Sequence, residues 1–440
     1  MKKLIGFWIT VILCQAGLMA QQNDTIRWDL ATAIVYAKEH NIQIRTLRLN
    51  QDLSQQDLLQ ARAARYPNLS GSATQSYTNS RNTDPVVGGF QTQAKMAGNY
   101  GLNSSWTLYR GGYLNYDVQS KNLLLQSDNL ATQMVENDVT LQVTQAYLNI
   151  LLAKETIVYV QDQVNTSKAQ YEQGRIRYDL GSIAKKDLLQ LEAQAAGDEY
   201  NLVNAQNQYR QNIVTLKQLL QLPTSTAFAP LEPDTLIVEQ AVPSLAEAQR
   251  IALQNRPEVE NAEVLLKVAE IELDKARTGF RPSLSLGGAV STGYSDNQET
   301  KYFGQLNDNL FQRFGLTLSV PIFDNRITRS NVQRSKILIN QAKLSLTDTR
   351  TILEQQIEQA YIALLNAHGQ YKAATVQMRA NQEAYAISLE QQRLGAINTV
   401  DLLVQRNLYI QSVQNYIQAK YNTVLNFKIY NFYMGIPVTL

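Results

Sequence analysis

Apolar residues recur at every seventh position over two long stretches in the first half of the chain. One stretch runs from Tyr113 to about Gln173, and the other follows Gly181. The recurring residues are Val143, Ile150, Ile157, Val164 and Tyr171, then Leu188, Ala195, Leu202, Tyr209 and Leu216. A seven-residue repeat predicts helices whose apolar seams pack against other helices. At 1.5 Å per residue, the first helix would be roughly 90 Å long.

Four shorter stretches alternate between apolar and polar residues, and a period of two predicts β-strands. They cover about residues 68–78, 98–109, 282–294 and 312–323. In the first of them, Leu69, Ala73 and Tyr77 would share one face, and serine and threonine residues would share the other. Each predicted strand therefore has one small or apolar face and one polar face.

The whole pattern occurs twice. A helix expected from Asp29 to about Tyr66 has a counterpart from Ser244 to Phe280, and Ser244 stands 215 residues after Asp29. We therefore expect a first structural repeat over 21–222, a Pro-rich linker over 223–243 in a belt at mid-height, and a second repeat over 244–440. Within the repeats, the long helices are expected over 113–173 and 326–391, the turns over 174–185 and 392–400, and the returning helices over 186–221 and 401–434.

Both turns carry a leucine, a glycine and, six residues after the glycine, an aspartate. Leu180-Gly181 precedes Asp187, and Leu394-Gly395 precedes Asp401. A glycine in the left-handed conformation ends one helix, and an aspartate is favoured in the first turn of the next. The two turns are therefore predicted to be the tips of antiparallel helical hairpins.

The N-terminus predicts export. Lys2 and Lys3 precede an apolar run that ends near Ala20, so residues 1–20 have the pattern of a cleavable signal peptide. The single cysteine, Cys14, lies inside it after the large residue Leu13, which argues against lipidation. Without Lys2 and Lys3, the 40 basic residues become 38 and balance the 38 acidic ones, which gives no electrostatic case for binding nucleic acid. No later stretch approaches about 18 consecutive apolar residues, so no transmembrane helix is expected in the mature chain.

The predicted strands indicate an outer membrane. Aromatic residues fringe their apolar faces in the manner of a membrane girdle, namely Tyr77, Tyr100, Trp106, Tyr109, Tyr294 and Phe323. A four-stranded wall has two open edges, which lipid does not tolerate, so the barrel would have to close between chains. Eight strands from two chains would be filled by their own side chains, whereas twelve from three would leave a channel, which favours a trimer. The alternative is a soluble four-stranded sheet joined to a helical bundle.

With these features, the chain resembles the outer-membrane efflux proteins typified by TolC. The resemblance covers essentially the whole mature chain, and its most specific parts are the two tips and the Gln-Ala-Tyr triplets at Gln145 and Gln359. It implies a mainly α fold with a transmembrane β part: duplicated long helical hairpins plus four strands per chain. As a homotrimer these would form a 12-stranded β-barrel continuous with a 12-helix α-barrel. It also implies a passive exit duct in the cell outer membrane, with a long periplasmic extension, for tripartite efflux or type I secretion. The expected partners are outer-membrane lipid, a periplasmic adaptor and an inner-membrane pump of the RND or ABC type.

The resemblance also implies which residues form the periplasmic aperture and the docking tips. The aperture would use Asp401, Asp187, Lys185, Lys186, Asn398 and Arg393, and the adaptor would contact Leu180, Gly181, Leu394, Gly395 and Arg177. Two positions depart from the family pattern, because Val404 replaces a second ring acid and Ile397 a constricting arginine. The simpler alternatives are that the aspartates only favour helix starts, the glycines only make turns, and the lysines are solvated surface.

Neither catalysis nor a cofactor is expected. His40 and His368 lie in predicted helices without a second histidine or a carboxylate pair at ligand spacing, so a metal site is not expected either. Two other classes remain as alternatives to the duct. One is a periplasmic adaptor, which normally carries a single hairpin, and the other is a structural coiled-coil protein of the envelope.

Overall fold

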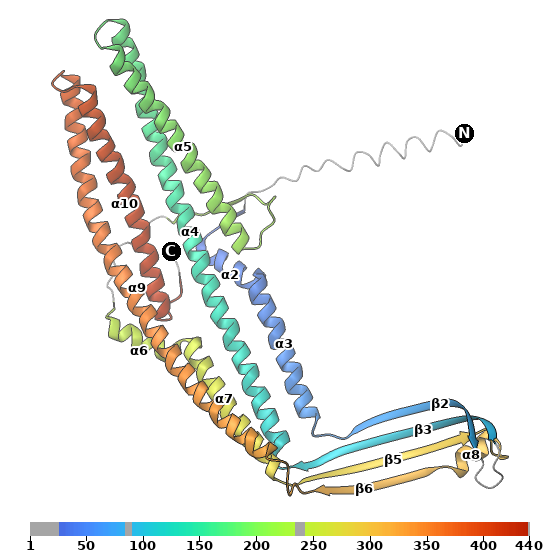
Figure 1. Ribbon diagram of the computed structural model, residues 1–440. Helices are drawn as coiled ribbons and strands as arrows, with labels where there is room; N and C mark the ends of the chain where they lie inside the picture. Colours follow the sequence, from blue (N-terminus) through green and yellow to red (C-terminus); the bar gives the residue numbers. More distant parts are fainter. Residues whose placement is uncertain (1–25, 84–89, 234–242, 439–440) are drawn as a thin grey trace, which may run out of the picture. The chain divides into compact units, whose positions relative to one another are not determined.

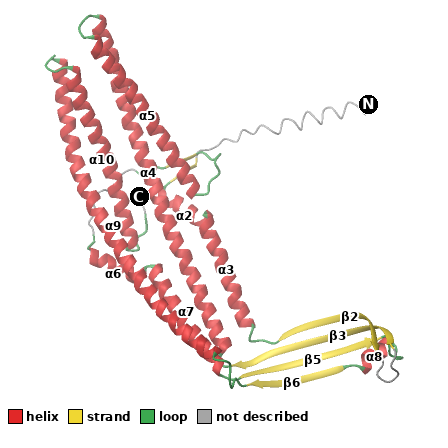
Figure 2. Cartoon of the chain, in the orientation of Figure 1, coloured by secondary structure: helices red, strands yellow, loops and turns green. Residues whose placement is uncertain are grey.

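The computed structural model describes residues 26–83, 90–233 and 243–438. The expected signal peptide and residues 234–242 of the expected linker lie outside the described residues. Most described residues are helical, and the strands form one four-stranded sheet and one short pair (Figures 1 and 2). Two compact units share the chain: unit 1 comprises Met1–Arg45, Met134–Arg256 and Leu353–Leu440, and unit 2 comprises Thr46–Gln133 and Pro257–Ile352.

The elements follow the same order in both halves of the chain, except that α8 is inserted between the two strands of the second half. The helices are α2 (Leu30–His40), α3 (Ile42–Ala63), α4 (Tyr113–Asp179), α5 (Lys185–Leu219), α6 (Leu245–Asn255), α7 (Pro257–Arg277), α8 (Tyr302–Asp308), α9 (Ile327–Arg393) and α10 (Thr399–Tyr433). The strands are β1 (Ile26–Trp28), β2 (Asn68–Thr83), β3 (Phe90–Arg110), β4 (Phe228–Pro230), β5 (Ser283–Ser295) and β6 (Phe311–Ser319). Both long helices, α4 and α9, contain 67 residues. None of the helices in the described ranges is both long and apolar enough to cross a membrane.

The prediction of one continuous helix at the start of each half is wrong. The first breaks at Asn41, whose backbone is extended and whose Oδ1 accepts hydrogen bonds from the amides of Gln43 and Ile44. The second breaks at Arg256, which is also extended because it precedes Pro257. Pro257 starts α7, a position where its missing N–H costs nothing. Each half therefore begins with a short helix and then a longer one.

The core of unit 1 joins the short helix α2 to the middle of α4 and the ends of α5 and α10. Leu30, Val143, Leu216 and Val424 are among its buried members. β1 and β4, which the sequence did not predict, form a parallel pair beside this core. The buried Tyr147 hydroxyl lies between the carbonyl oxygens of Trp28 and Leu231, at 3.1 and 2.5 Å. The short strands are thereby fastened to α4.

The four-stranded sheet of unit 2 is antiparallel throughout, in the order β2-β3-β5-β6. Its register places Gly71, Leu102 and Val290 side by side on one face, which we call the apolar face. Leu69, Tyr100, Leu286, Phe314 and Leu316 extend this face, whereas Ser70, Asn103, Ser291, Arg313 and Thr317 lie on the opposite, polar face. The sheet thus largely separates apolar from polar side chains as the alternation predicts, with Gln75 and Gln312 on the apolar face and Phe311 on the polar face as exceptions.

The strand ends differ from the predicted ones. β2 extends to Thr83, beyond the expected end at residue 78. β3 begins at Phe90, before the expected start at residue 98. β6 ends at Ser319 rather than Phe323, because Pro321 cannot donate to a ladder. Phe323 therefore lies outside the sheet, with 85% of its surface exposed. The expected loop before β6 contains α8.

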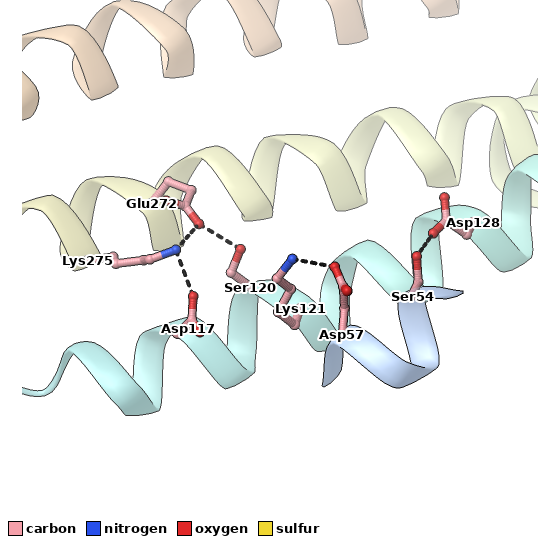
Figure 3. Close-up of polar contacts among 8 residues, drawn as sticks. All are labelled: Ser54, Asp57, Asp117, Ser120, Lys121, Asp128, Glu272 and Lys275. Atoms are coloured by element: carbon pink, nitrogen blue, oxygen red, sulfur yellow. Dashed lines mark hydrogen bonds and ion pairs between the residues drawn. The ribbon is translucent and has the colours of Figure 1, made fainter. Parts of the chain in front are cut away.

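Polar contacts join α3, α4 and α7 within unit 2 (Figure 3). Lys275 of α7 pairs with Asp117 of α4 at 2.9 Å and with Glu272 of its own helix at 3.0 Å. Burial lowers the pKa of Lys275, but the hydrogen bonds to both carboxylates outweigh it and raise that pKa overall. Two further links to α4, Lys121 with Asp57 and Asp128 with Ser54, hold α3 against it.

Candidate functional site: the helical tips and the seam between the hairpins

The first tip joins α4 to α5 through a tight turn at residues 180–184. Gly181 has φ +74°, the left-handed conformation that the turn prediction requires. Its amide donates to the carbonyl of Tyr178 at 2.8 Å, and the Ser182 amide donates to that of Arg177 at 2.7 Å. These two bonds form a Schellman motif, which satisfies carbonyls at the helix end. Leu180 projects from the turn with 75% of its surface exposed.

The second tip joins α9 to α10 by the same geometry. Gly395 has φ +75°, and the amides of Gly395 and Ala396 donate to the carbonyls of Gln392 and Gln391. Leu394 is 71% exposed, like its counterpart in the first tip. The tips differ in the next helix: the Asn398 side chain caps α10 by accepting from the Asp401 amide at 2.9 Å, whereas Ala184 starts α5 without a side-chain cap.

The structure gives the predicted aperture residues different surroundings. Asp401 lies exposed in the first turn of α10, and Asp187 is half-buried in the first turn of α5. Arg393 pairs with Glu390 of its own helix at 2.6 Å, and this hydrogen bond raises the pKa of its guanidinium. Lys185 and Lys186 are exposed, and within the described chain neither forms an ion pair with Asp187. The acidic groups at both tips are therefore open to partners outside the chain.

Five of the six predicted girdle residues lie on the apolar face of the sheet. Tyr77 pairs with Met96, and Tyr294 lies opposite Gly98, towards one end of the strands. Trp106 lies towards the other end, where its indole N–H donates to the Arg65 carbonyl at 2.8 Å. A bulge between Thr107 and Tyr109 brings Tyr109 opposite Leu284, onto the same face as Tyr100 and Trp106. Phe323, outside the sheet, is the exception.

A buried ion pair joins the two hairpins. Arg406 of α10 pairs with Asp198 of α5 at 2.6 Å, and each side chain is 3% exposed. The same Arg406 nitrogen donates to the Gln163 carbonyl of α4 at 3.3 Å. The other terminal nitrogen of Arg406, the Gln163 amide nitrogen and the Tyr159 hydroxyl are buried without a hydrogen-bond partner in the described chain. Burial raises the pKa of Tyr159.

A second link between the hairpins lies farther from the tips. Glu155 of α4 accepts from Lys420 at 2.9 Å and from the Tyr421 hydroxyl at 2.8 Å, and both donors belong to α10. Burial, followed by the Glu155 carboxylate, raises the pKa of Tyr421. Each link places a charge of α10 against an opposite charge of the first hairpin. The second hairpin therefore meets the first through ionic and hydrogen-bonded contacts as well as through apolar packing.

Neither link was predicted from the sequence, although the heptad spacing contained a signal for the first. Asp198 lies three residues after Ala195 and four before Leu202, which is the alternate position of a helical seam. A carboxylate at a seam position calls for a buried cation, and Arg406 is that cation. In the described ranges, no cluster of three or more His, Cys, Asp or Glu residues is placed to hold a metal ion.

Comparison with known proteins gives consistent matches. A family model described as "Outer membrane efflux protein" matches residues 33–221 and 249–427. The chain is 23% identical over 432 residues to the outer membrane protein TolC of Vibrio cholerae, covering 97% of this chain and 94% of that protein. Among solved structures, CusC aligns with a TM-score of 0.79 at 20% identity, over 94% of both chains. The Campylobacter jejuni CmeC outer membrane channel aligns with a TM-score of 0.78 at 18% identity, over 92% of this chain and 86% of that one.

Proposed function

Because the chain belongs to the outer membrane efflux protein family, we propose that three copies of it assemble into a passive exit duct. The outer-membrane location and the role in efflux that the sequence resemblance implied are confirmed at the level of the family. The subunit count, the partners and the entrance residues are our proposal.

The sheet with two open edges carries the proposal. Within the described chain, β2 and β6 each pair on one side only. An open edge exposes a row of unpaired N–H and C=O groups, each of which would cost several kcal/mol in lipid. Pairing β2 of one copy with β6 of the next removes both edges. Three copies supply twelve strands, enough for a water-filled channel, whereas the eight strands of a dimer would be filled by side chains.

The faces of the sheet support a wall between lipid and water. The apolar face bears Leu102, Val290 and Leu316 in its middle and aromatic residues towards both ends. Tyr100 and Trp106 are six residues apart on β3, which corresponds to about 20 Å along the strand. The polar face would line the channel mostly with small hydroxyl and amide side chains, together with Arg313.

The helical hairpins would continue the channel into the periplasm. We assign the entrance to the tips, where the exposed Asp401 and the half-buried Asp187 of three copies would form a ring of carboxylates. Lys185, Lys186, Asn398 and Arg393 lie close enough in sequence to take part. The exposed leucines beside Gly181 and Gly395, together with Arg177, would contact a periplasmic adaptor. An inner-membrane pump of the RND or ABC type would supply the energy and select the cargo.

The subunit count is tested by the intact mass of the purified protein in detergent. Three chains per particle, which separate only after heating, are the expected result. A stable monomer that keeps its β structure would contradict the proposal, because its two sheet edges would then be tolerated without partners.

A further inference from the structure

The outer part of β5 extends beyond its neighbour β6. β5 pairs with β3 as far as Ser295, opposite Ala97, but with β6 only as far as Ser291, opposite Phe311. Residues 292–295 therefore have a strand on one side only. Their other edge is covered by the segment that leads through α8 back into β6.

The side chain of Gln305 in α8 replaces the missing strand. Its Oε1 accepts from the Ser295 amide at 2.7 Å, and its Nε2 donates to the Ser295 carbonyl at 2.9 Å. These are the two hydrogen bonds that a neighbouring strand would make with this residue. Gln305 is 3% exposed, and Asn309 adds a bond to the Gly293 carbonyl at 2.7 Å. Such a cap is needed where an unpaired edge would meet lipid, since water pairs the same groups without help.

The helix α8 lies on the apolar face of the sheet. Tyr302 packs edge-on against Tyr294, with ring centroids 4.8 Å apart, and its hydroxyl lies 3.2 Å from that of Tyr100. Thr292, on the same face, donates to the carbonyl of Leu306 at 2.6 Å. Since Val290 and Leu102 continue this face, α8 stands on the side that the proposed barrel turns towards lipid.

The side of α8 remote from the sheet presents a large apolar group. Phe303 is two residues from Gln305, about 200° around the helix, and 82% of its surface is exposed. Leu310, which follows the helix, is 51% exposed. Lys301, exposed directly before the helix, can reach polar headgroups. An exposed aromatic on a capped, apolar edge is the arrangement of an element that lies in a membrane interface.

We propose that α8 is an interfacial anchor that inserts Phe303 into the outer leaflet of the outer membrane, with membrane lipid as its partner. The inference rests on the barrel of the proposed function, because that barrel turns the apolar face towards lipid. Its Gln305 cap keeps the end of β5 paired at the depth where headgroups meet acyl chains. Tyr302 holds the helix against the wall, and Phe303 enters the lipid.

Fluorescence quenching by brominated lipid tests the anchor. Trp106 is first replaced by phenylalanine, and a tryptophan is then placed singly at Phe303, Leu316 or Thr317 in the full-length protein. The proteins are reconstituted into phosphatidylcholine vesicles with bromine near the headgroup end of the acyl chains. Leu316→Trp, on the apolar face, is the positive control, and Thr317→Trp, on the polar face, is the negative one. Trp28, and Trp8 wherever the expected signal peptide is retained, give a background common to all three.

The expected result is that Phe303→Trp loses as much fluorescence to the brominated lipid as Leu316→Trp, while Thr317→Trp loses little. If Leu316→Trp is quenched and Phe303→Trp is not, the proposed anchoring role of α8 is wrong, whereas the proposed barrel is still supported. If Leu316→Trp also escapes quenching, the apolar face does not meet lipid, and the proposed function fails together with the anchor.

Discussion

Arg406 of α10 and Asp198 of α5 form an ion pair of 2.6 Å, and each side chain is only 3% exposed to solvent. The pair joins the second hairpin to the first, and Arg406 also donates to the backbone of α4 at Gln163. Removing two charges from water is costly, so a buried pair is stable only while both partners remain. The contact is therefore a point where the packing of the two hairpins depends on single side chains.

Asp198→Asn should destabilise the packing of the hairpins. The substitution keeps the shape of the side chain but leaves the Arg406 charge buried without a counter-charge, which costs about 3–5 kcal/mol. Thermal unfolding followed by circular dichroism measures the loss. The double variant Asp198→Leu with Arg406→Met should regain most of it, because an apolar pair replaces a buried ionic one at little cost. The matched control is Glu263→Gln, which breaks a pair with Arg350 whose side chains are 42% and 49% exposed. An equal loss in the control would refute a special role for burial.

Deprotonation of the Tyr421 hydroxyl should make the protein less stable at high pH. Burial and the Glu155 carboxylate raise the pKa of Tyr421 in the folded chain above its ordinary value near 10. The folded state then holds the phenolic proton more tightly than the unfolded state, so the stabilisation is complete below about pH 10 and declines as the pH rises above it. Tyr421→Phe should reduce this decline, as measured by thermal unfolding between about pH 9 and 11. Tyr200→Phe, at a 69% exposed position of α5, is the matched control substitution.

A side chain at either tip glycine should destabilise the turn, for a reason that lies in the backbone alone. A Cβ at Gly181 or Gly395 would meet no atom within 4 Å, but both residues have φ near +75°. Gly181→Ala should therefore cost about 1–2 kcal/mol. Gly197→Ala, in the interior of α5 with equally open surroundings, should instead stabilise by about 0.5–1 kcal/mol. Equal effects of the two substitutions would contradict the left-handed turn.

The docking role of the tips is a separate prediction. A bulky residue at Gly181 or Gly395 should abolish export while the barrel still assembles, because it distorts the surface offered to an adaptor. Export of a known pump substrate from cells, together with the trimer band on a gel, measures both. Normal export in both variants would remove the tips from docking.

Asp401 should control the block of ionic current by cations at the periplasmic end. Its exposed carboxylate attracts divalent cations when three copies meet, so Asp401→Ala should weaken the block and change little else. The measurement is the current through reconstituted channels with divalent cations added on the periplasmic side. Asp348→Asn removes an exposed carboxylate of α9 far along the chain from the tip and should keep the block. An unchanged block in Asp401→Ala would exclude this residue from the aperture.

Local signals in the sequence were enough to predict the helical hairpins and the two faces of the sheet. The glycine turns follow from a short pattern, and the faces of β3 and β5 follow from a period of two. The break before Pro257 was also accessible, because the residue before a proline avoids helical geometry. The break at Asn41 was less accessible, since its side chain both caps α3 and reaches the Leu219 carbonyl, which is 178 residues away in the sequence.

Contacts between distant segments account for what the sequence did not predict. From the sequence, Gln305 would be assigned to a loop. Its capping role follows only from the structure, in which β5 extends beyond the end of β6. Asp198 and Arg406 are 208 residues apart, so the heptad could suggest a buried carboxylate without identifying its partner. The family resemblance was confirmed, yet Val404 and Ile397 depart from its gate, and the links between the hairpins use other residues.

The conductance of the purified protein in a planar lipid bilayer tests whether a trimer contains an open path for ions. Protein with the mass of three chains should produce uniform steps of ionic current. The absence of such steps from protein that has this mass and has inserted into the bilayer would contradict the duct.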